Sequence, residues 1–134
     1  MRLLRILAFP LALLYGIGIY IRNALYDMGW LRSEKFQTKT ISVGNLSIGG
    51  TGKTPMIEWL ITQIPATFKV AVVTRGYGRK GSTPLLALTD HSSKEIGDEP
   101  KQLITKFPDL CLRVDGNRRR AIQWLEATMK PDII

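Results

Sequence analysis

The sequence predicts an α/β fold, in which a parallel sheet is flanked by helices and preceded by an apolar N-terminal helix. Short apolar runs at residues 69–74 and 110–114 alternate with stretches of helical periodicity, as in βαβ units. A third β-prone run precedes a glycine-rich loop at residues 47–54. An uncharged stretch at residues 6–21 comes before all of them.

Composition indicates a folded chain with an anionic partner. The 134 residues are 45% hydrophobic and 22% charged, which excludes wholesale disorder. Lys and Arg number 19 against 11 acidic residues, so the net charge of +8 favours a nucleotide, a phospholipid or a nucleic acid. The single cysteine, Cys111, excludes a disulfide framework, and we expect it to be a small core residue.

The apolar stretch at residues 6–21 predicts an N-terminal helix that associates with a membrane. As a helix it would be roughly 24 Å long, short of the ~30 Å hydrocarbon core, and Pro10, Gly16 and Gly18 weaken it. No small-residue cleavage site follows, which disfavours a signal peptide. Aromatic and basic residues typical of a membrane interface follow instead.

We therefore expect a membrane-associating helix and linker over residues 1–36, and a core over residues 37–134. A helix lying in the cytoplasmic leaflet, or only partly inserted, fits better than a full crossing. A helix buried against its own domain is the alternative.

The glycine-rich loop predicts a P-loop NTPase-like core. It follows a β-prone run with Ile41 and Val43 and precedes an amphipathic helix with Pro55 in its first turn, the context that a P-loop requires. Its glycines and the helix N-terminus suit a phosphate. The sequence departs from the usual pattern at one position, where serine replaces glycine, and an ordinary glycine turn is the alternative. The loop comprises Ser47, Ile48, Gly49, Gly50, Thr51, Gly52, Lys53 and Thr54.

In a P-loop, Lys53 would reach the β- and γ-phosphates of ATP and the Thr54 hydroxyl would ligate Mg²⁺. The second strand, residues 69–74, leads into a basic loop with Arg75 and Arg79. Ligands of open α/β sheets bind at this edge, although a solvated loop is the alternative.

Asp98 and Glu99 lie at the start of a helix predicted within residues 96–107. They are expected either to cap it or, for Asp98, to accept a proton from a hydroxyl that attacks the γ-phosphate. Residues 85–88 are a weak strand candidate, and His91 is expected to be exposed in a polar loop.

Residues 110–114 predict a third strand, and the helix after it, running to about Met129, begins with Arg118, Arg119 and Arg120. Three cations at a helix start oppose the macrodipole, so we expect them to meet phosphate or lipid unless they form a solvated face. Residues 131–134 resemble the opening of another strand. We expect no acidic residue at the end of a core strand to complete Mg²⁺ binding, so the chain is expected to be the N-terminal piece of a larger enzyme.

Four segments, SVGNLSIGGTGKTP, VVTRGYGRK, IGDEP and VDGNRRRAI, resemble the tetraacyldisaccharide 4'-kinases of lipid A biosynthesis in this order. The resemblance covers only the first part of a family member. It implies phosphoryl transfer from ATP to the 4'-hydroxyl of a tetraacyldisaccharide 1-phosphate, which yields lipid IVA at the cytoplasmic face of the bacterial inner membrane. In the family a later strand ends in an acidic pair, and KPDII resembles the lead-in to it.

The resemblance also implies roles for individual residues. Residues 47–54 would bind ATP, with Lys53 on the phosphates, Thr54 on Mg²⁺ and Asp98 as the base. The expected partners are ATP, the acylated disaccharide 1-phosphate lipid and the membrane surface, but no nucleic acid. The basic residues that would meet substrate phosphate or lipid head groups are Arg75, Arg79, Arg118, Arg119 and Arg120.

Two other functions stay open on sequence grounds. A membrane-associated P-loop ATPase switch usually has a lysine near the start of its glycine run, where this chain has Leu46, Ser47 and Ile48. A non-catalytic nucleotide-binding fragment is the second, and we expect these 134 residues alone to catalyse poorly. A nucleic-acid binder ranks below both because no recognised binding motif occurs.

Overall fold

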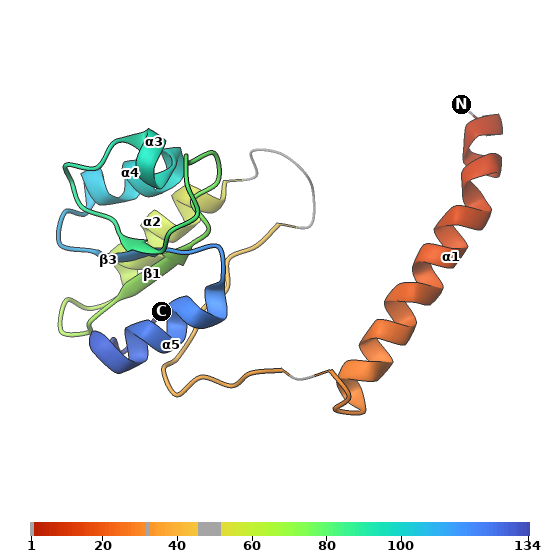
Figure 1. Ribbon diagram of the computed structural model, residues 1–134, viewed down its shortest axis with the longest axis horizontal. Coiled ribbons are helices and arrows are strands. Elements are labelled where there is room, and N and C mark those ends of the chain that lie inside the picture. The colour runs from red at the N-terminus through yellow and green to blue at the C-terminus, as the bar shows by residue number, and fades with distance from the viewer. Residues whose placement is uncertain (1, 32, 46–51) are drawn as a thin grey trace. The chain divides into compact units, whose positions relative to one another are not determined.

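A computed structural model describes residues 2–31, 33–45 and 52–134 of the chain (Figure 1). The contacts divide the chain into two compact units, Met1–Lys35 and Phe36–Ile134. The mixed α/β class expected from the sequence is confirmed by the helices and the small sheet.

The described residues of the first unit form one helix, α1 (Arg2–Asp27). It continues through Pro10, Gly16 and Gly18, the residues expected to weaken it as a regular helix. A single proline removes one backbone hydrogen bond, and the other turns of a 26-residue helix remain. Within the described part of the chain, no helix is both long enough and apolar enough to cross a membrane.

The second unit is built on a three-stranded sheet in the order β1-β3-β2. The strands are β1 (Ala71–Thr74), β2 (Leu85–Leu86) and β3 (Cys111–Val114). β1 runs parallel to β3, with Ala71 opposite Cys111, whereas β2 pairs antiparallel to β3 at the edge. The strands predicted at residues 69–74, 85–88 and 110–114 are therefore confirmed, each shorter than the run that predicts it.

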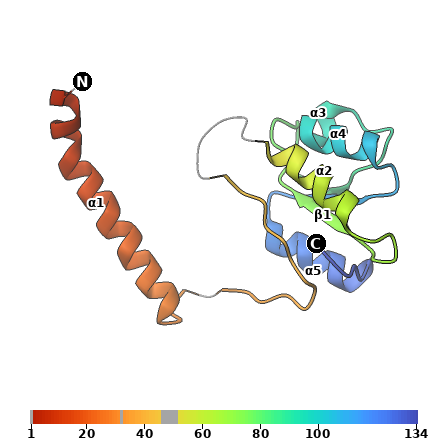
Figure 2. The same ribbon diagram turned by 180° about the vertical axis from the view of Figure 1, so that it is seen from behind.

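In the described part of this unit four helices accompany the sheet, and Figures 1 and 2 show α2, α3 and α4 on one face and α5 on the other. Their bounds are α2 (Lys53–Gln63), α3 (Ser93–Ile96), α4 (Asp98–Lys106) and α5 (Arg118–Thr128). The short helix α3 is absent from the sequence predictions, and its start is fixed by a capping box between Ser92 and Glu95.

The alternation of side chains along β3 separates the two faces of the sheet. Leu112 and Val114 are fully buried in the core that also contains Ile96, Leu103 and Ile104 from α3 and α4. Arg113 belongs to the opposite face, and its guanidinium carbon lies 4.2 Å from the centre of the Trp124 ring of α5. The sheet is therefore covered by aliphatic packing on one face and by a cation–π contact on the other.

The predicted strand before the glycine-rich loop forms only isolated pairings. Lys39 pairs in parallel with Ile133, and the Ile41 N–H donates to the Ile134 carbonyl at 2.8 Å. Ile133 also pairs with Val70, just before β1. Ile133 and Ile134 thus lie between residues 39–41 and β1, and the strand predicted at residues 131–134 is present as these bridges.

Candidate nucleotide-binding site

Three segments of the core run in the same direction and end at one edge of the sheet. Residues 39–41 and β1 are both parallel to Ile133, and β1 is parallel to β3. The chain leaves this edge at Gly44, at Arg75 after β1, and at Asp115 after β3. Ligands of open α/β sheets bind at such carboxyl ends, so the predicted site residues cluster where the fold class favours a ligand.

Lys53 and Thr54 form the first turn of α2, and both side chains are half-buried. Gly52 precedes them in the left-handed region, with φ of 79°, where a side chain would be strained. The other predicted loop residues, Ser47, Ile48, Gly49, Gly50 and Thr51, lie outside the described residues. The described part of the loop thus places a lysine and a hydroxyl at a helix N-terminus, where an anion is favoured.

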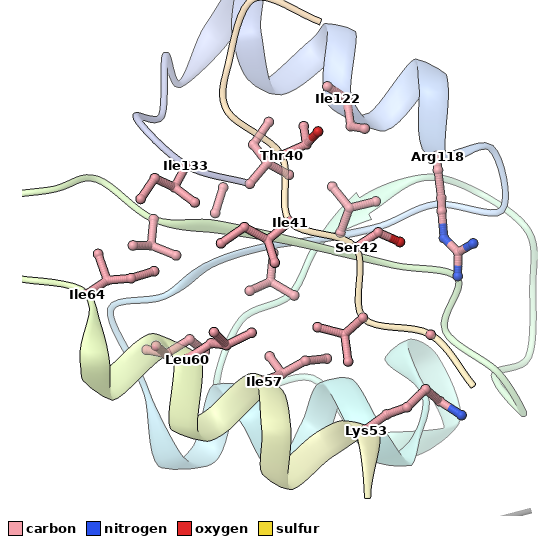
Figure 3. A pocket seen from close by; sticks show the side chains of 18 of the residues that line it. Thr40, Ile41, Ser42, Lys53, Ile57, Leu60, Ile64, Arg118, Ile122 and Ile133 are labelled. Atoms are coloured by element: carbon pink, nitrogen blue, oxygen red, sulfur yellow. The ribbon is translucent and has the colours of Figure 1, made fainter. Parts of the chain in front are cut away.

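A cavity of about 470 Å³ lies between α2, β1, α5 and residues 40–45. Figure 3 shows Lys53 and Arg118 at one end, with Ile64 and Ile133 at the other. A second hollow of about 350 Å³ adjoins Lys53 and is lined by residues 42–45 together with Gly52, Met56 and Leu60. The cavity is therefore basic at its mouth and aliphatic inside.

The backbone of the loop after β1 lies close to the backbone at the start of α4, and glycines make this close approach possible. A Cβ atom on Gly97 would lie 2.8 Å from the Tyr77 carbonyl oxygen, and one on Gly76 would lie 2.8 Å from the Ile96 carbonyl oxygen. Only glycine permits such approaches, so the segments RGYG and IGDEP fit backbone to backbone. Asp98, the first residue of α4, is consequently held beside this loop with its side chain exposed.

The predicted basic residues have different surroundings. Arg75 is exposed, whereas Arg79 is half-buried and its Nη1 donates to the Thr83 carbonyl at 2.9 Å. Arg118 lines the cavity. Arg79 therefore stabilises the loop that it belongs to, and Arg75 and Arg118 face solvent or the cavity.

Arg120 is bound by an acidic residue that was not among the residues predicted from the sequence. The Asp115 carboxylate is fully buried and accepts hydrogen bonds from Arg120 Nε at 3.0 Å and Nη2 at 2.7 Å. It also accepts the Asn117 N–H at 2.8 Å. These hydrogen bonds, above all those from Arg120, hold the pKa of Asp115 below its usual range, and the pair raises the pKa of Arg120.

The expectation that no acidic residue follows a core strand is therefore wrong, because Asp115 comes directly after β3. Its oxygens are engaged by Arg120 and by the backbone that begins α5. The sequence did carry a signal for this residue, because Asp115 directly follows the apolar run at residues 110–114. Asn117 completes the arrangement as the N-cap of α5, where it accepts the N–H groups of Arg119 and Arg120.

His91 and Cys111 are not among the residues that line the cavity. His91 is half-buried and its Nδ1 accepts the Leu88 N–H at 3.0 Å, so the expectation of an exposed histidine is wrong. Cys111 is half-buried at the start of β3, and burial raises the pKa of its thiol. A raised thiol pKa leaves little thiolate at neutral pH, in keeping with a packing role.

Comparison with known proteins matches residues 4–134 to the family described as Tetraacyldisaccharide-1-P 4'-kinase. The chain is similar to the tetraacyldisaccharide 4'-kinase of Parabacteroides distasonis, with 49% identity over 93% of this chain and 35% of that protein. It is 47% identical to that of Flavobacterium johnsoniae, over 100% of this chain and 40% of that protein. The chain thus spans 35–40% of the length of these curated relatives.

Among solved structures, the chain is similar to the "apo" form of LpxK from Aquifex aeolicus in complex with ATP. The TM-score is 0.80 at 32% sequence identity, over 97% of this chain and 42% of that one.

Proposed function

This chain belongs to the tetraacyldisaccharide-1-P 4'-kinase family, and we propose that it forms the ATP-binding part of a kinase acting on a tetraacyldisaccharide 1-phosphate. The reaction transfers the γ-phosphoryl group of ATP to the 4'-hydroxyl and yields lipid IVA and ADP. The observation that carries the proposal is the position of Lys53, at the start of α2 and at the basic mouth of the cavity.

Lys53 and the N-terminus of α2 bind the phosphates of ATP in this proposal. The half-buried lysine follows left-handed Gly52, and Arg118 adds a second positive charge at the same end of the cavity (Figure 3). Phosphoryl transfer is catalysed mostly by positioning and by stabilising charge, so cations at this place suit the reaction. The ATP in the similar Aquifex aeolicus structure supports the assignment.

The residues present fit a magnesium ion that is held mainly by the nucleotide. Residues 2–31, 33–45 and 52–134 contain no group of three or more His, Cys, Asp or Glu side chains able to hold a metal. Mg²⁺ commonly takes one or two protein oxygens and completes its shell with phosphates and water. The Thr54 hydroxyl, next to Lys53, would be such a ligand, and the ion would neutralise charge on the phosphates.

Asp98 is the proposed base for the 4'-hydroxyl. Its exposed carboxylate begins α4 and is held beside the loop after β1 by the contact of Gly97 with Tyr77. An exposed carboxylate at the ligand-binding edge is able to accept a proton from an incoming hydroxyl. Arg75, Arg118 and Arg119 would meet the substrate phosphate or lipid head groups, while Arg79 and Arg120 position the segments around them.

We also propose that α1 attaches the protein to the cytoplasmic face of the inner membrane. Its large apolar side chains between residues 9 and 21 are exposed, from 40% for Ile19 to 75% for Tyr20. Arg22 lies 5.1 Å above the ring of Tyr26, so a cation and an aromatic ring are paired near the end of the helix. Such a helix suits the interface between headgroups and acyl chains, where an acylated substrate is also found.

The first test measures ATP binding to the chain itself. We expect Lys53→Ala to weaken binding at least about 10-fold, since a charge-assisted phosphate contact contributes about 1.5–3 kcal/mol. Lys94→Ala, which removes an exposed lysine on α3, is the control and leaves binding unchanged. Equal affinities for the two variants would refute the assignment of Lys53.

The second test measures phosphoryl transfer in detergent. Because this chain covers 40% of the Flavobacterium johnsoniae relative, it is joined to the part of that protein which it does not cover. We expect 4'-phosphorylated product, and a loss of about 100-fold or more in Lys53→Ala and in Asp98→Ala. ATP hydrolysis that is independent of the lipid acceptor would instead favour an ATPase switch.

A further inference from the structure

Helices α2 and α4 lie on the same face of the sheet (Figures 1 and 2) and run in the same direction. α2 begins with Lys53 and leads into β1, which starts at Ala71. α4 begins with Asp98, beside the loop after β1, and leads into β3, which starts at Cys111. Because β1 and β3 are parallel, both helices begin at the carboxyl edge of these strands. Lys53 and Asp98 therefore share the edge at which ligands of such sheets bind.

A carboxylate in the middle of α2 binds two side chains of α4. Glu58 Oε2 accepts a hydrogen bond from Lys106 Nζ at 2.6 Å, and Oε1 accepts one from Gln102 Nε2 at 2.8 Å. The side chain of Glu58 is 14% exposed, whereas that of Lys106 is 55% exposed. The hydrogen bond from Lys106 is the main cause that lowers the pKa of Glu58, so the carboxylate is ionised at neutral pH. Glu58 thus connects α2 to α4 through both of its oxygens.

The two α4 residues that bind Glu58 belong to the same helical row as Asp98. Asp98, Gln102 and Lys106 are spaced four residues apart, which places them on one face of a helix. Glu58 therefore holds the face of α4 that begins with Asp98. Along the helix axes, about 6 Å separates Gln102 from Asp98, and about 7.5 Å separates Glu58 from Lys53. The contact therefore fixes the axial position of Asp98 relative to Lys53.

Apolar packing, rather than this contact, holds both helices on the sheet. Leu103 and Ile104 of α4 are buried in the core, and Ile57 and Ile61 of α2 pack against the same core. Ion pairs with an exposed partner contribute little to stability. Hydrogen bonds are directional and apolar packing is not, so the Glu58 contact restricts sliding of α4 along α2. Such restriction matters for catalysis, because a misplacement of about 1 Å is able to lower a rate about 100-fold.

We propose that Glu58 is a positioning residue of the kinase, which sets the place of Asp98 relative to Lys53 by binding α4 to α2. The phosphate site and the base come from two different helices, so their separation depends on how these helices are held together. Glu58 acts through Gln102 and Lys106 and takes no part in the chemistry itself. The inference rests on the proposed function, in which Lys53 binds the phosphates of ATP and Asp98 accepts the proton of the 4'-hydroxyl.

The test measures kcat and the KM for ATP, in this chain joined to the part of the Flavobacterium johnsoniae relative that it does not cover. The variants are Glu58→Lys, Lys106→Glu and the double variant, which exchanges the two charges. We expect each single variant to lower kcat about 10-fold and to change the KM for ATP less than about 2-fold. The double variant remakes the ion pair in reverse and is expected to recover kcat to within about 3-fold of the unaltered protein.

The control is Lys101→Glu, which makes the same change of charge on the same helix. Lys101 Nζ donates to the Thr89 carbonyl at 2.8 Å and so binds the loop after β2 instead of α2. We expect this variant to keep the kcat of the unaltered protein.

Urea unfolding of the same proteins separates positioning from stability. Single variants with a lower urea midpoint but an unchanged kcat under native conditions would show a structural role alone and overturn the proposal. A loss of kcat that the double variant does not recover, or an equal loss in Lys101→Glu, would overturn it as well. If the unaltered protein yields no phosphorylated product, the proposed kinase function fails, and this inference fails with it. Single variants as active as an active unaltered protein would refute the positioning role alone.

Discussion

Asp115 binds Arg120, five residues further along the chain, through both Nε and Nη2. The carboxylate is fully buried at the end of β3, whereas the arginine side chain is 57% exposed. The pair therefore fastens the first turn of α5 to the sheet edge, beside the cavity that Arg118 enters. Because the buried charge of Asp115 has one main partner, we expect the loss of this contact to destabilise the core.

Replacing Asp115 by Asn is expected to lower the free energy of unfolding by about 1–3 kcal/mol, because the charge-assisted hydrogen bonds from Arg120 are lost. Urea unfolding at neutral pH measures the change. Asp109→Asn, which alters an exposed aspartate in a turn, is the control and is expected to have a small effect. Similar losses of unfolding free energy in both variants would show that the Asp115–Arg120 pair does not stabilise the fold.

The same pair predicts a pH dependence of stability. Because Arg120 holds the pKa of Asp115 below its unfolded value, the stabilisation is complete above that value, about 3.9. It is lost as the pH falls through the lower, folded pKa. The difference in urea midpoint between the native chain and Asp115→Asn should therefore be constant from about pH 7 to pH 5 and shrink below about pH 4. A difference that grew on acidification would contradict the sign of the shift.

Gly97→Ala is expected to destabilise the fold by about 1–3 kcal/mol, through the positive φ of 98° and the 2.8 Å approach to the Tyr77 oxygen. Gly81→Ala separates the two causes, since Gly81 has φ of 101° and a Cβ added there would have no atom within 4 Å. The excess loss at Gly97 measures the steric contact. Equal losses in thermal unfolding would mean that the two loops are not interlocked.

Leu112→Ala is expected to cost about 2–5 kcal/mol, because its side chain is fully buried among Ile96, Leu103 and Ile104. Leu88→Ala removes the same atoms at a position that is 56% exposed, and should cost far less. Urea unfolding of both variants gives the comparison. A small effect at Leu112 would contradict the assignment of this side of the sheet as the core.

Elements with strong local patterns were predictable from the sequence. Helices α2, α4 and α5 and strands β1 and β3 follow from apolar periodicity, and Asp98 stands at its expected helix start. The segment around Ile41 was harder, because its pairing depends on Ile134, far along the chain. The strand propensity of a few residues does not predict which segment they will pair with.

The different contacts of the three arginines at the start of α5 were not predictable from such local signals. Three consecutive arginines look alike in sequence, yet Arg118 lines the cavity and Arg120 binds Asp115. Their directions follow from the helical turn and from the buried position of Asp115, which only the packed sheet establishes. The position of Lys53 at a helix start was predictable, because the glycine loop and the helix start are local signals.

The pairing of Lys39 with Ile133 has a consequence for the order in which the core forms. The two residues are 94 positions apart, so at about 5–20 residues per second a ribosome adds Ile133 roughly 5–20 s after Lys39. Throughout that interval residues 39–41 lack their neighbour in the sheet. Residues 39–41 are therefore unable to pair with Ile133 until it has been synthesised, and an unpaired strand edge exposed in this interval is prone to aggregation.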